Sequence, residues 1–191
     1  MDSDWKVIET ARVGDHGIFT VRRDRAVSPH TGYQKDYSIL ECSDWVNVVA
    51  RTPEGLFVLV RQWRVGARRY TVEIPGGAVD RSDGGPEAAA RRELREETGY
   101  TAERFLLLGT VEPNPAFQTN RCYTFLAENT LQTDELRLDP GEEIDVLLAG
   151  ADEIDGMVER GEIGHALVIA GWFWYRRWLH RAREGGEEKP R

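Results

Sequence analysis

The chain has 191 residues, of which 40% are hydrophobic and 30% charged, and its formal net charge is −8. This length predicts one compact domain, or one domain with an extension, with enough apolar residues for a substantial core. The net charge of −8 argues against non-specific binding of nucleic acid, which requires a basic surface that displaces counterions.

Strands are expected first along the chain, and strands mixed with helices later. Turns are predicted at 14–17, inside a hairpin, and at 52–55. The predicted strands are 5–13, 17–25, 37–51, 56–63, 70–74, 105–112, 121–127 and 143–149. The predicted helices run from Pro86 to Gly99, over 152–160 and over 166–181, and a frayed polar tail is expected at 185–191.

The N-terminal sequence, the apolar runs and the cysteines predict a cytoplasmic protein. The segment 1–10 lacks the basic start and apolar stretch of a secretory signal. The most apolar run, 166–174, is too short to span a bilayer, so no membrane association is expected. Cys42 and Cys122 lack metal-ligand spacing and are interpreted as free thiols in a reducing compartment, with one disulfide as the alternative.

The helix predicted from Pro86 to Gly99 carries three glutamates on one face. Proline suits the first turn of a helix, where its missing N–H is not needed, and glycine suits the end. Glu93, Glu96 and Glu97 stand at i, i+3 and i+4, where like charges repel at a cost of roughly a few tenths of a kcal/mol per pair. The cluster therefore predicts a cation, and ligands that are all oxygen favour Mg2+ or Mn2+. The alternative is a solvated acidic face that the neighbouring arginines screen.

The residues around this helix resemble the signature of the Nudix hydrolases, which runs G-x5-E-x7-R-E-U-x-E-E-x-G-U, with U a bulky apolar residue. The second half is complete from Arg92 to Gly99, and Tyr100 takes the last U position. The glycines of the first half are Gly76 and Gly77, expected in a loop. The resemblance covers roughly 45–180 and implies an α/β fold, the α/β/α sandwich of this family around a mixed sheet.

One position departs from the signature. Fourteen residues separate Gly77 from Arg92 where the signature has thirteen, and its first glutamate falls near Asp83 and Gly84. We interpret this as a one-residue insertion, with Asp83 as the nearest acidic substitute. The departure leaves the helix half intact but puts the geometry of the loop and the role of this acidic residue in question.

Three flanking segments resemble the branch of ADP-ribose and nucleoside-diphosphate-sugar pyrophosphatases. VRQWR at 60–64 is similar to its R-Q-x-R strand, EIP at 73–75 matches its E-[LIF]-P, and PNPAF at 113–117 lies where it has a substrate loop. Enzymes of this branch carry an N-terminal β region that takes part in dimer formation and holds the nucleobase. We therefore predict an N-terminal β extension at 1–44, a Nudix hydrolase domain at 45–181 and a polar tail at 182–191.

The resemblance implies a metal site on the helix. Its ligands would be Glu93, Glu96, Glu97 and the carbonyl of Gly76, and its cofactor Mg2+, with Mn2+ possible. A bound cation would neutralise the pyrophosphate, bridge its oxygens and lower the pKa of a bound water. Arg92 is expected to orient the glutamates.

The remaining site residues are implied by the same resemblance. Glu142, in a late acidic loop, matches the glutamate that activates water, with Glu143 as fallback; Glu96 and Glu97 complete the predicted catalytic set. Arg64, with Arg61, would contact the phosphates, and their alternative is ordinary salt bridging on a strand. Glu73 and Trp45 complete the predicted substrate site, although a tryptophan in a strand is more often core than a stacking platform. His165 is expected to be a cap or turn residue.

These residues together predict a metal-dependent pyrophosphohydrolase that cleaves ADP-ribose or a nucleoside-diphosphate sugar into a nucleoside monophosphate and a sugar phosphate. We expect a homodimer built through the N-terminal strands. One alternative is a nucleoside-triphosphate clean-up hydrolase, against which residues 1–44 count, because such enzymes lack this extension. Another is a Nudix module that senses nucleotide sugars without catalysis. The sequence identifies neither the base nor the sugar.

Overall fold

The computed structural model describes residues 4–138, 141 and 143–184, and it divides into two compact units. The first unit comprises Met1–Asp44 and Glu112–Arg121, and the second comprises Trp45–Val111 and Cys122–Arg191. The predicted tail at 185–191 lies outside the described residues. No helix in the described part of the chain is long and apolar enough to cross a bilayer.

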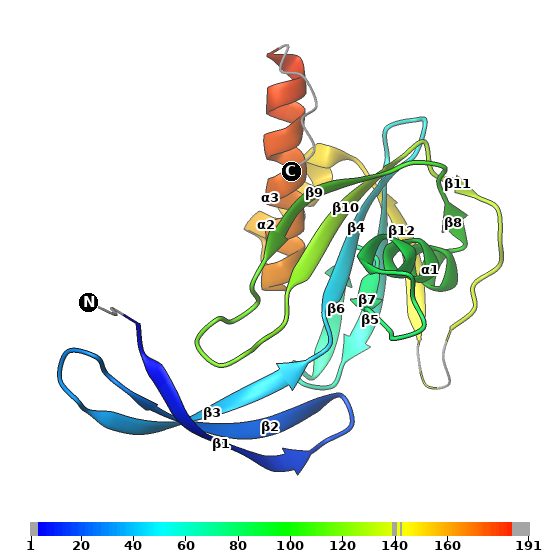
Figure 1. Ribbon diagram of the computed structural model, residues 1–191. Coiled ribbons are helices and arrows are strands. Elements are labelled where there is room, and N and C mark those ends of the chain that lie inside the picture. The colour runs from blue at the N-terminus through cyan, green and yellow to red at the C-terminus, as the bar shows by residue number, and fades with distance from the viewer. Residues whose placement is uncertain (1–3, 139–140, 142, 185–191) are drawn as a thin grey trace. The chain divides into compact units, whose positions relative to one another are not determined.

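The first unit is an antiparallel sheet of three strands in the order β1-β2-β3 (Figure 1). The strands are β1 (Lys6–Asp15), β2 (Phe19–Val27) and β3 (Gln34–Cys42). The predicted hairpin is confirmed: β1 and β2 pair around His16 and Gly17, and Gly17 has a φ of 77°. The segment Glu112–Arg121 joins this sheet because Phe117 and Thr119 exchange backbone hydrogen bonds with Leu40.

The second unit is built on a mixed sheet in the order β12-β5-β4-β10-β9, with β6 paired to β5 and β7 paired to β4. Its strands are β4 (Trp45–Arg51), β5 (Phe57–Arg64), β6 (Arg69–Glu73), β7 (Gly76–Ala78), β9 (Phe105–Val111), β10 (Cys122–Glu128) and β12 (Ile144–Ala149). Strands β4 and β10 run parallel, and the other pairs are antiparallel. A separate two-stranded pair consists of β8 (Tyr100–Thr101) and β11 (Leu131–Gln132).

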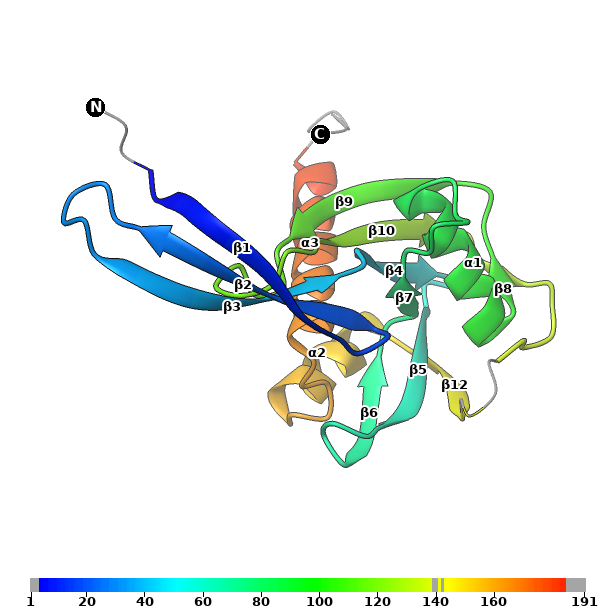
Figure 2. The ribbon, with the colours of Figure 1, turned by 60° about the horizontal axis from the view of Figure 1, so that its bottom comes forward.

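Helices cover both faces of this sheet, as Figures 1 and 2 show. Helix α1 (Pro86–Thr98) lies on one face, and α2 (Ala151–Glu159) and α3 (Ala166–Arg183) lie on the other. Successive side chains of a strand point to opposite faces, so Val48 packs with Leu94 of α1 while Val49 packs with Trp172 of α3. The structure confirms the predicted α/β/α sandwich with an N-terminal β extension.

The prediction of one strand over 37–51 is wrong. The structure has two strands there, β3 in the first unit and β4 in the second. The chain leaves the first sheet at Asp44, whose Oδ1 accepts a hydrogen bond of 2.8 Å from the backbone N–H of Arg121. This contact comes from a residue far along the chain, and the stretch 37–51 contains neither Gly nor Pro to mark the break.

The two glycines of the signature lie in a strand instead of the predicted loop. Gly76 and Gly77 belong to β7, where they pair with Asn47 and Val46 of β4. A Cβ atom on Gly76 would lie 2.1 Å from the carbonyl oxygen of Val46, so only glycine fits this close approach. Strand β7 is thereby fixed against the centre of the sheet, next to α1.

Candidate active site

Two glutamates of α1 lie against the backbone of β7. The N–H of Gly76 donates a hydrogen bond of 3.0 Å to Oε2 of Glu97, which is buried. A Cβ atom on Gly77 would lie 2.3 Å from Oε1 of Glu93, so this carboxylate rests on the bare backbone of the glycine. Helix α1 begins at Pro86 and ends at Gly99, which adopts a left-handed φ of 71°.

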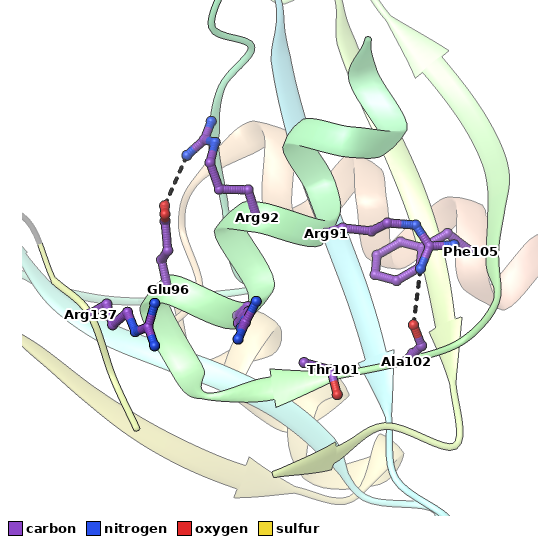
Figure 3. Close-up of a pocket in the computed structure, with 8 residues that line it drawn as sticks. Arg91, Arg92, Glu96, Thr101, Ala102, Phe105 and Arg137 are labelled. Atoms are coloured by element: carbon purple, nitrogen blue, oxygen red, sulfur yellow. Dashed lines mark hydrogen bonds and ion pairs between the residues drawn. The ribbon is translucent and has the colours of Figure 1, made fainter. Parts of the chain in front are cut away.

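Arg92 joins two of the three glutamates. Its Nη1 donates to Oε1 of Glu93 at 2.9 Å and to Oε2 of Glu96 at 3.1 Å, and Figure 3 shows the second of these contacts. The guanidinium offsets part of the repulsion between the carboxylates, which α1 presents on one side. The structure thus places Arg92 where it can orient the glutamates.

Asp83 fixes Arg92 from the loop before α1. Nε and Nη2 of Arg92 donate to the two Asp83 oxygens, each at 3.0 Å, and Nη2 also donates to the carbonyl of Ala78 at 3.1 Å. The hydrogen bonds from Arg92 hold the pKa of Asp83 below its ordinary value. The loop therefore still places a carboxylate, that of Asp83, against Arg92 of α1 despite its additional residue.

The donors at this site suit a divalent cation in their chemistry. Glu93, Glu96 and Glu97 offer carboxylate oxygens from one helix face, and the strand beside them carries no side chain at Gly76 or Gly77. Hard cations such as Mg2+ take oxygen ligands of this kind. Within the part of the chain that the structure describes, however, no group of three or more His, Cys, Asp or Glu side chains is gathered closely enough to hold an ion.

Glu73 is the centre of a second network of hydrogen bonds. Nε and Nη2 of Arg64 donate to its two oxygens, both at 2.8 Å, and Oγ1 of Thr71 donates to Oε1 at 2.6 Å. The Nδ1 atom of His165 lies 3.1 Å from Oε2. Burial opposes the charge of Glu73, but the hydrogen bonds from Arg64, His165 and Thr71 outweigh it and hold the pKa of Glu73 well below its ordinary value.

The contacts of Glu73 bear on two predictions from the sequence, that Glu73 belongs to the substrate site and that His165 is a cap or turn residue. Glu73 is only 3% exposed, and its two carboxylate oxygens contact Arg64, Thr71 and His165. His165 is the N-cap residue of α3, as expected, but its contact with Glu73 was not foreseen. The two residues are 92 positions apart, so no local pattern signals their contact.

Arg61 lies on the other face of the sheet from Arg64. Alternate residues of β5 point to opposite faces, and these two residues are three positions apart. Nη1 of Arg61 donates to Oδ2 of Asp145 at 2.9 Å, and its guanidinium stands 4.1 Å from the centre of the Tyr70 ring. The structure therefore does not bring the two arginines together.

The other predicted site residues are placed as follows. Trp45 is partly buried at the start of β4, in register with Ala78 of β7 and Cys122 of β10. Glu142 lies outside the described residues. Glu143 is exposed and stands immediately before β12.

The segment after β11 is tied to the C-terminal end of α1. Nη2 of Arg95 donates to Oδ1 of Asp134 at 2.7 Å, and the backbone N–H of Arg137 donates to the carbonyl of Glu96 at 2.9 Å. The carbonyl of Gly99 accepts two more backbone hydrogen bonds, from Thr133 and Asp134. Sequence reasoning missed this anchor, because its partners on α1 come more than thirty residues earlier.

The fold and the carboxylate helix define the class of protein: an α/β/α sandwich whose candidate site joins a Gly-Gly strand to a helix bearing three glutamates. The model of the NUDIX domain matches residues 44–170. The chain belongs to the Nudix family, as its sequence predicted, and members of this family generally use a divalent metal ion.

Three similar proteins bear related names. An ADP-ribose pyrophosphatase of Bacillus subtilis (strain 168) is 36% identical over 119 residues, which cover 62% of this chain and 64% of that protein. The chain thus spans just under two thirds of this relative. An ADP-ribose pyrophosphatase of Mycobacterium tuberculosis is 28% identical over 172 residues, covering 89% of this chain and 82% of that protein. A crystal structure of an ADP compounds hydrolase has the same fold, with a TM-score of 0.81 at 20% identity over 92% of this chain and 94% of that one.

Proposed function

We propose that this protein is a metal-dependent pyrophosphohydrolase that cleaves ADP-ribose, or a related nucleoside-diphosphate sugar, into a nucleoside monophosphate and a sugar phosphate. The observation that carries the proposal is the contact of Glu93 and Glu97 with the glycine backbone of β7. Membership in the Nudix family and the two relatives named ADP-ribose pyrophosphatase support the substrate class.

Glu93, Glu96, Glu97 and the carbonyl of Gly76 would hold the metal, for which we propose Mg2+, with Mn2+ as the alternative. A divalent ion held by these residues would neutralise the pyrophosphate and lower the pKa of a bound water. The chain prepares the carboxylates for this role: Gly76 holds Glu97 in place, and Arg92 orients Glu93 and Glu96.

Arg64 is proposed to bind the phosphates. Glu73 would contribute to substrate binding by holding the Arg64 guanidinium in place. The bidentate contact with the buried Glu73 fixes the plane of the guanidinium, while the Arg64 side chain remains 44% exposed. A fixed planar guanidinium matches paired phosphate oxygens. Arg61 lies on the opposite face of β5 and is not part of this contact, whereas Trp45, at the start of β4, would stack on the base.

Glu142 is proposed as the general base that takes a proton from the attacking water, and Glu143 is the fallback. Both lie on the connection between β11 and β12, which the Arg95–Asp134 ion pair ties to α1. A base must come within hydrogen-bonding reach of the proton that it removes.

We further propose a cytoplasmic homodimer that binds a small nucleotide sugar and neither nucleic acid nor membrane. The first unit exposes large apolar side chains that a second copy would cover: Trp5, Val7, Ile8, Val13, Ile18 and Tyr33. Cys42 and Cys122 are thiols that form no disulfide, which supports a reducing compartment, and the net charge of −8 argues against nucleic acid.

A substrate panel tests the function. ADP-ribose, ADP-glucose, GDP-mannose and ATP are each incubated with Mg2+, Mn2+ or chelator, and phosphate is measured after a phosphatase acts on the products. We expect metal-dependent cleavage of ADP-ribose to AMP and ribose 5-phosphate. Preference for ATP would indicate a clean-up hydrolase, and nucleotide-sugar binding without turnover would indicate a sensing module; either result overturns the proposal.

A further inference from the structure

A cavity of about 340 Å³ lies beside α1 and borders the proposed active site. Figure 3 shows its walls, which come from α1, the segment from β8 to the start of β9, and the segment after β11. The residues that line it are Arg91, Arg92, Arg95, Glu96, Thr101, Ala102, Phe105 and Arg137. Of the residues assigned to the active site, it shares Arg92 and Glu96; Glu93, Glu97, Glu73 and Arg64 are not among its lining residues.

Arginines outnumber carboxylates in the lining of this cavity. Four guanidinium groups and one carboxylate line it, although the whole chain has a net charge of −8, and Arg91 and Arg95 are also paired with Glu87 and Asp134. Guanidinium groups that keep unused N–H donors in a concave surface attract anions. The cavity is therefore suited to an anion.

Its arginines are held in place and still have donors to offer. Arg91 is fixed by Glu87, by the carbonyls of Ala102 and Glu103, and by stacking 4.3 Å from the centre of the Phe105 ring. Arg95 is fixed by one hydrogen bond from Nη2 to Asp134, which uses one of the five N–H donors of a guanidinium.

Arg137 supplies the fourth guanidinium. Its backbone N–H bonds Glu96, and within the described residues its exposed side chain makes no hydrogen bond. Arg95, which pairs with Asp134, lines the same cavity as Arg137.

We propose that this cavity is a binding site for a phosphate monoester dianion. A terminal phosphate has three oxygens for the charge-assisted hydrogen bonds that arginine forms best, and a cavity of about 340 Å³ lies in the range of small-ligand sites. Arg95 and Arg137 would bind the phosphate oxygens, and Arg91 would form the opposite wall. The cavity adjoins the proposed metal site through Arg92 and Glu96, but anion binding with chelator present and metal-dependent turnover are measured separately, so either can fail without the other.

Calorimetric titration into the full-length protein with chelator present tests this site, because removal of metal weakens any binding of phosphate at the glutamates. Inorganic phosphate, AMP and ribose 5-phosphate are titrated separately, to distinguish a free anion from a nucleotide or sugar source. The variants are Arg137→Gln and Arg95→Gln. The controls are Arg177→Gln, which removes an exposed arginine of α3, and Glu97→Gln.

We expect one saturable site for at least one of the three ligands. The affinity of this site should fall about tenfold in Arg137→Gln, because the variant loses about one charge-assisted hydrogen bond to the ligand. The affinity should remain unchanged in both controls. Arg95→Gln also breaks the ion pair with Asp134, so Arg137→Gln decides the outcome if Arg95→Gln fails to fold. Absence of saturable binding, or an equal loss in Arg177→Gln, would overturn the proposal.

Discussion

At the scale of the single residue, Arg92 links the loop to the carboxylates of the helix. Asp83 binds it on one edge, and Glu93 and Glu96 bind it at Nη1. Counted back from Arg92, the first glutamate of the Nudix signature falls on Gly84, one position after Asp83. The sequence alone therefore left the role of Asp83 in question. The structure shows that a carboxylate from the lengthened loop still reaches the arginine.

Replacement of Asp83 tests this link. Asp83→Asn removes the charge that holds Arg92, and we expect metal-dependent turnover to fall roughly tenfold or more, as for groups that orient metal ligands. The matched control is Asp80→Asn, because this neighbouring carboxylate is 63% exposed and stands 3.7 Å from Nη2 of Arg92. Steady-state rates of both variants give the comparison, and equal rates in Asp83→Asn and wild type would show that Asp83 has no orienting role.

Glu73 should make the free energy of unfolding depend on pH. Because its pKa is lowered in the folded state, it contributes stability that is present above its unfolded pKa of about 4.3 and is lost as the pH falls below that value. We expect Glu73→Gln to cost about 2 kcal/mol of unfolding free energy at pH 7, and this difference should shrink toward pH 3. Urea unfolding at several pH values measures it; a difference that stays constant with pH would contradict the assignment.

At the scale of the element, the close approach of β7 to α1 and to β4 depends on two glycines in different ways. On Gly76 a Cβ atom would meet the backbone oxygen of Val46, which cannot move without disturbing the sheet. On Gly77 it would meet the carboxylate of Glu93, the mobile end of a side chain.

The two alanine substitutions should therefore differ in what they impair, stability in one and turnover in the other. Gly76→Ala should destabilise the fold by on the order of 2 kcal/mol, because the strand must shift. Gly77→Ala should leave the melting temperature nearly unchanged but displace Glu93 and reduce metal-dependent turnover. Thermal melts and rates of the two variants check this contrast, which would be refuted if Gly77→Ala lost stability as much as Gly76→Ala.

The elements also show which features local sequence can predict. Helix α1 was predictable because Pro86 and Gly99 are local signals, and the three glutamates follow from its period. The division of 37–51 into β3 and β4 depends on the distant Arg121, and strand β7 depends on pairing with β4. The same limit applies to the site: its α1 residues were predicted, whereas the His165–Glu73 and Arg95–Asp134 contacts join distant parts of the chain.

At the scale of the whole molecule, the first unit exposes the apolar surface that motivates the proposed dimer. Val7 and Ile8 of β1 are both more than half exposed. The pairing of β1 with β2 has a register shift between Val7 and Glu9, so both exposed side chains are replaced together. We expect the wild type to sediment as a dimer and the double variant Val7→Lys, Ile8→Lys to shift toward the monomer. A wild type that stays monomeric at micromolar concentration would contradict the proposed dimer.

The most direct test of the central claim is the rate of ADP-ribose hydrolysis in Glu97→Gln with saturating Mg2+. The amide oxygen can still accept the hydrogen bond from Gly76, so the variant should fold, and a melting temperature near that of wild type verifies this. The matched control is Glu159→Gln, which neutralises an exposed glutamate at the end of α2. We predict that turnover falls about a hundredfold or more in Glu97→Gln and is unchanged in Glu159→Gln. Near-normal turnover in a folded Glu97→Gln protein would contradict the assignment of α1 as the metal-binding, catalytic helix.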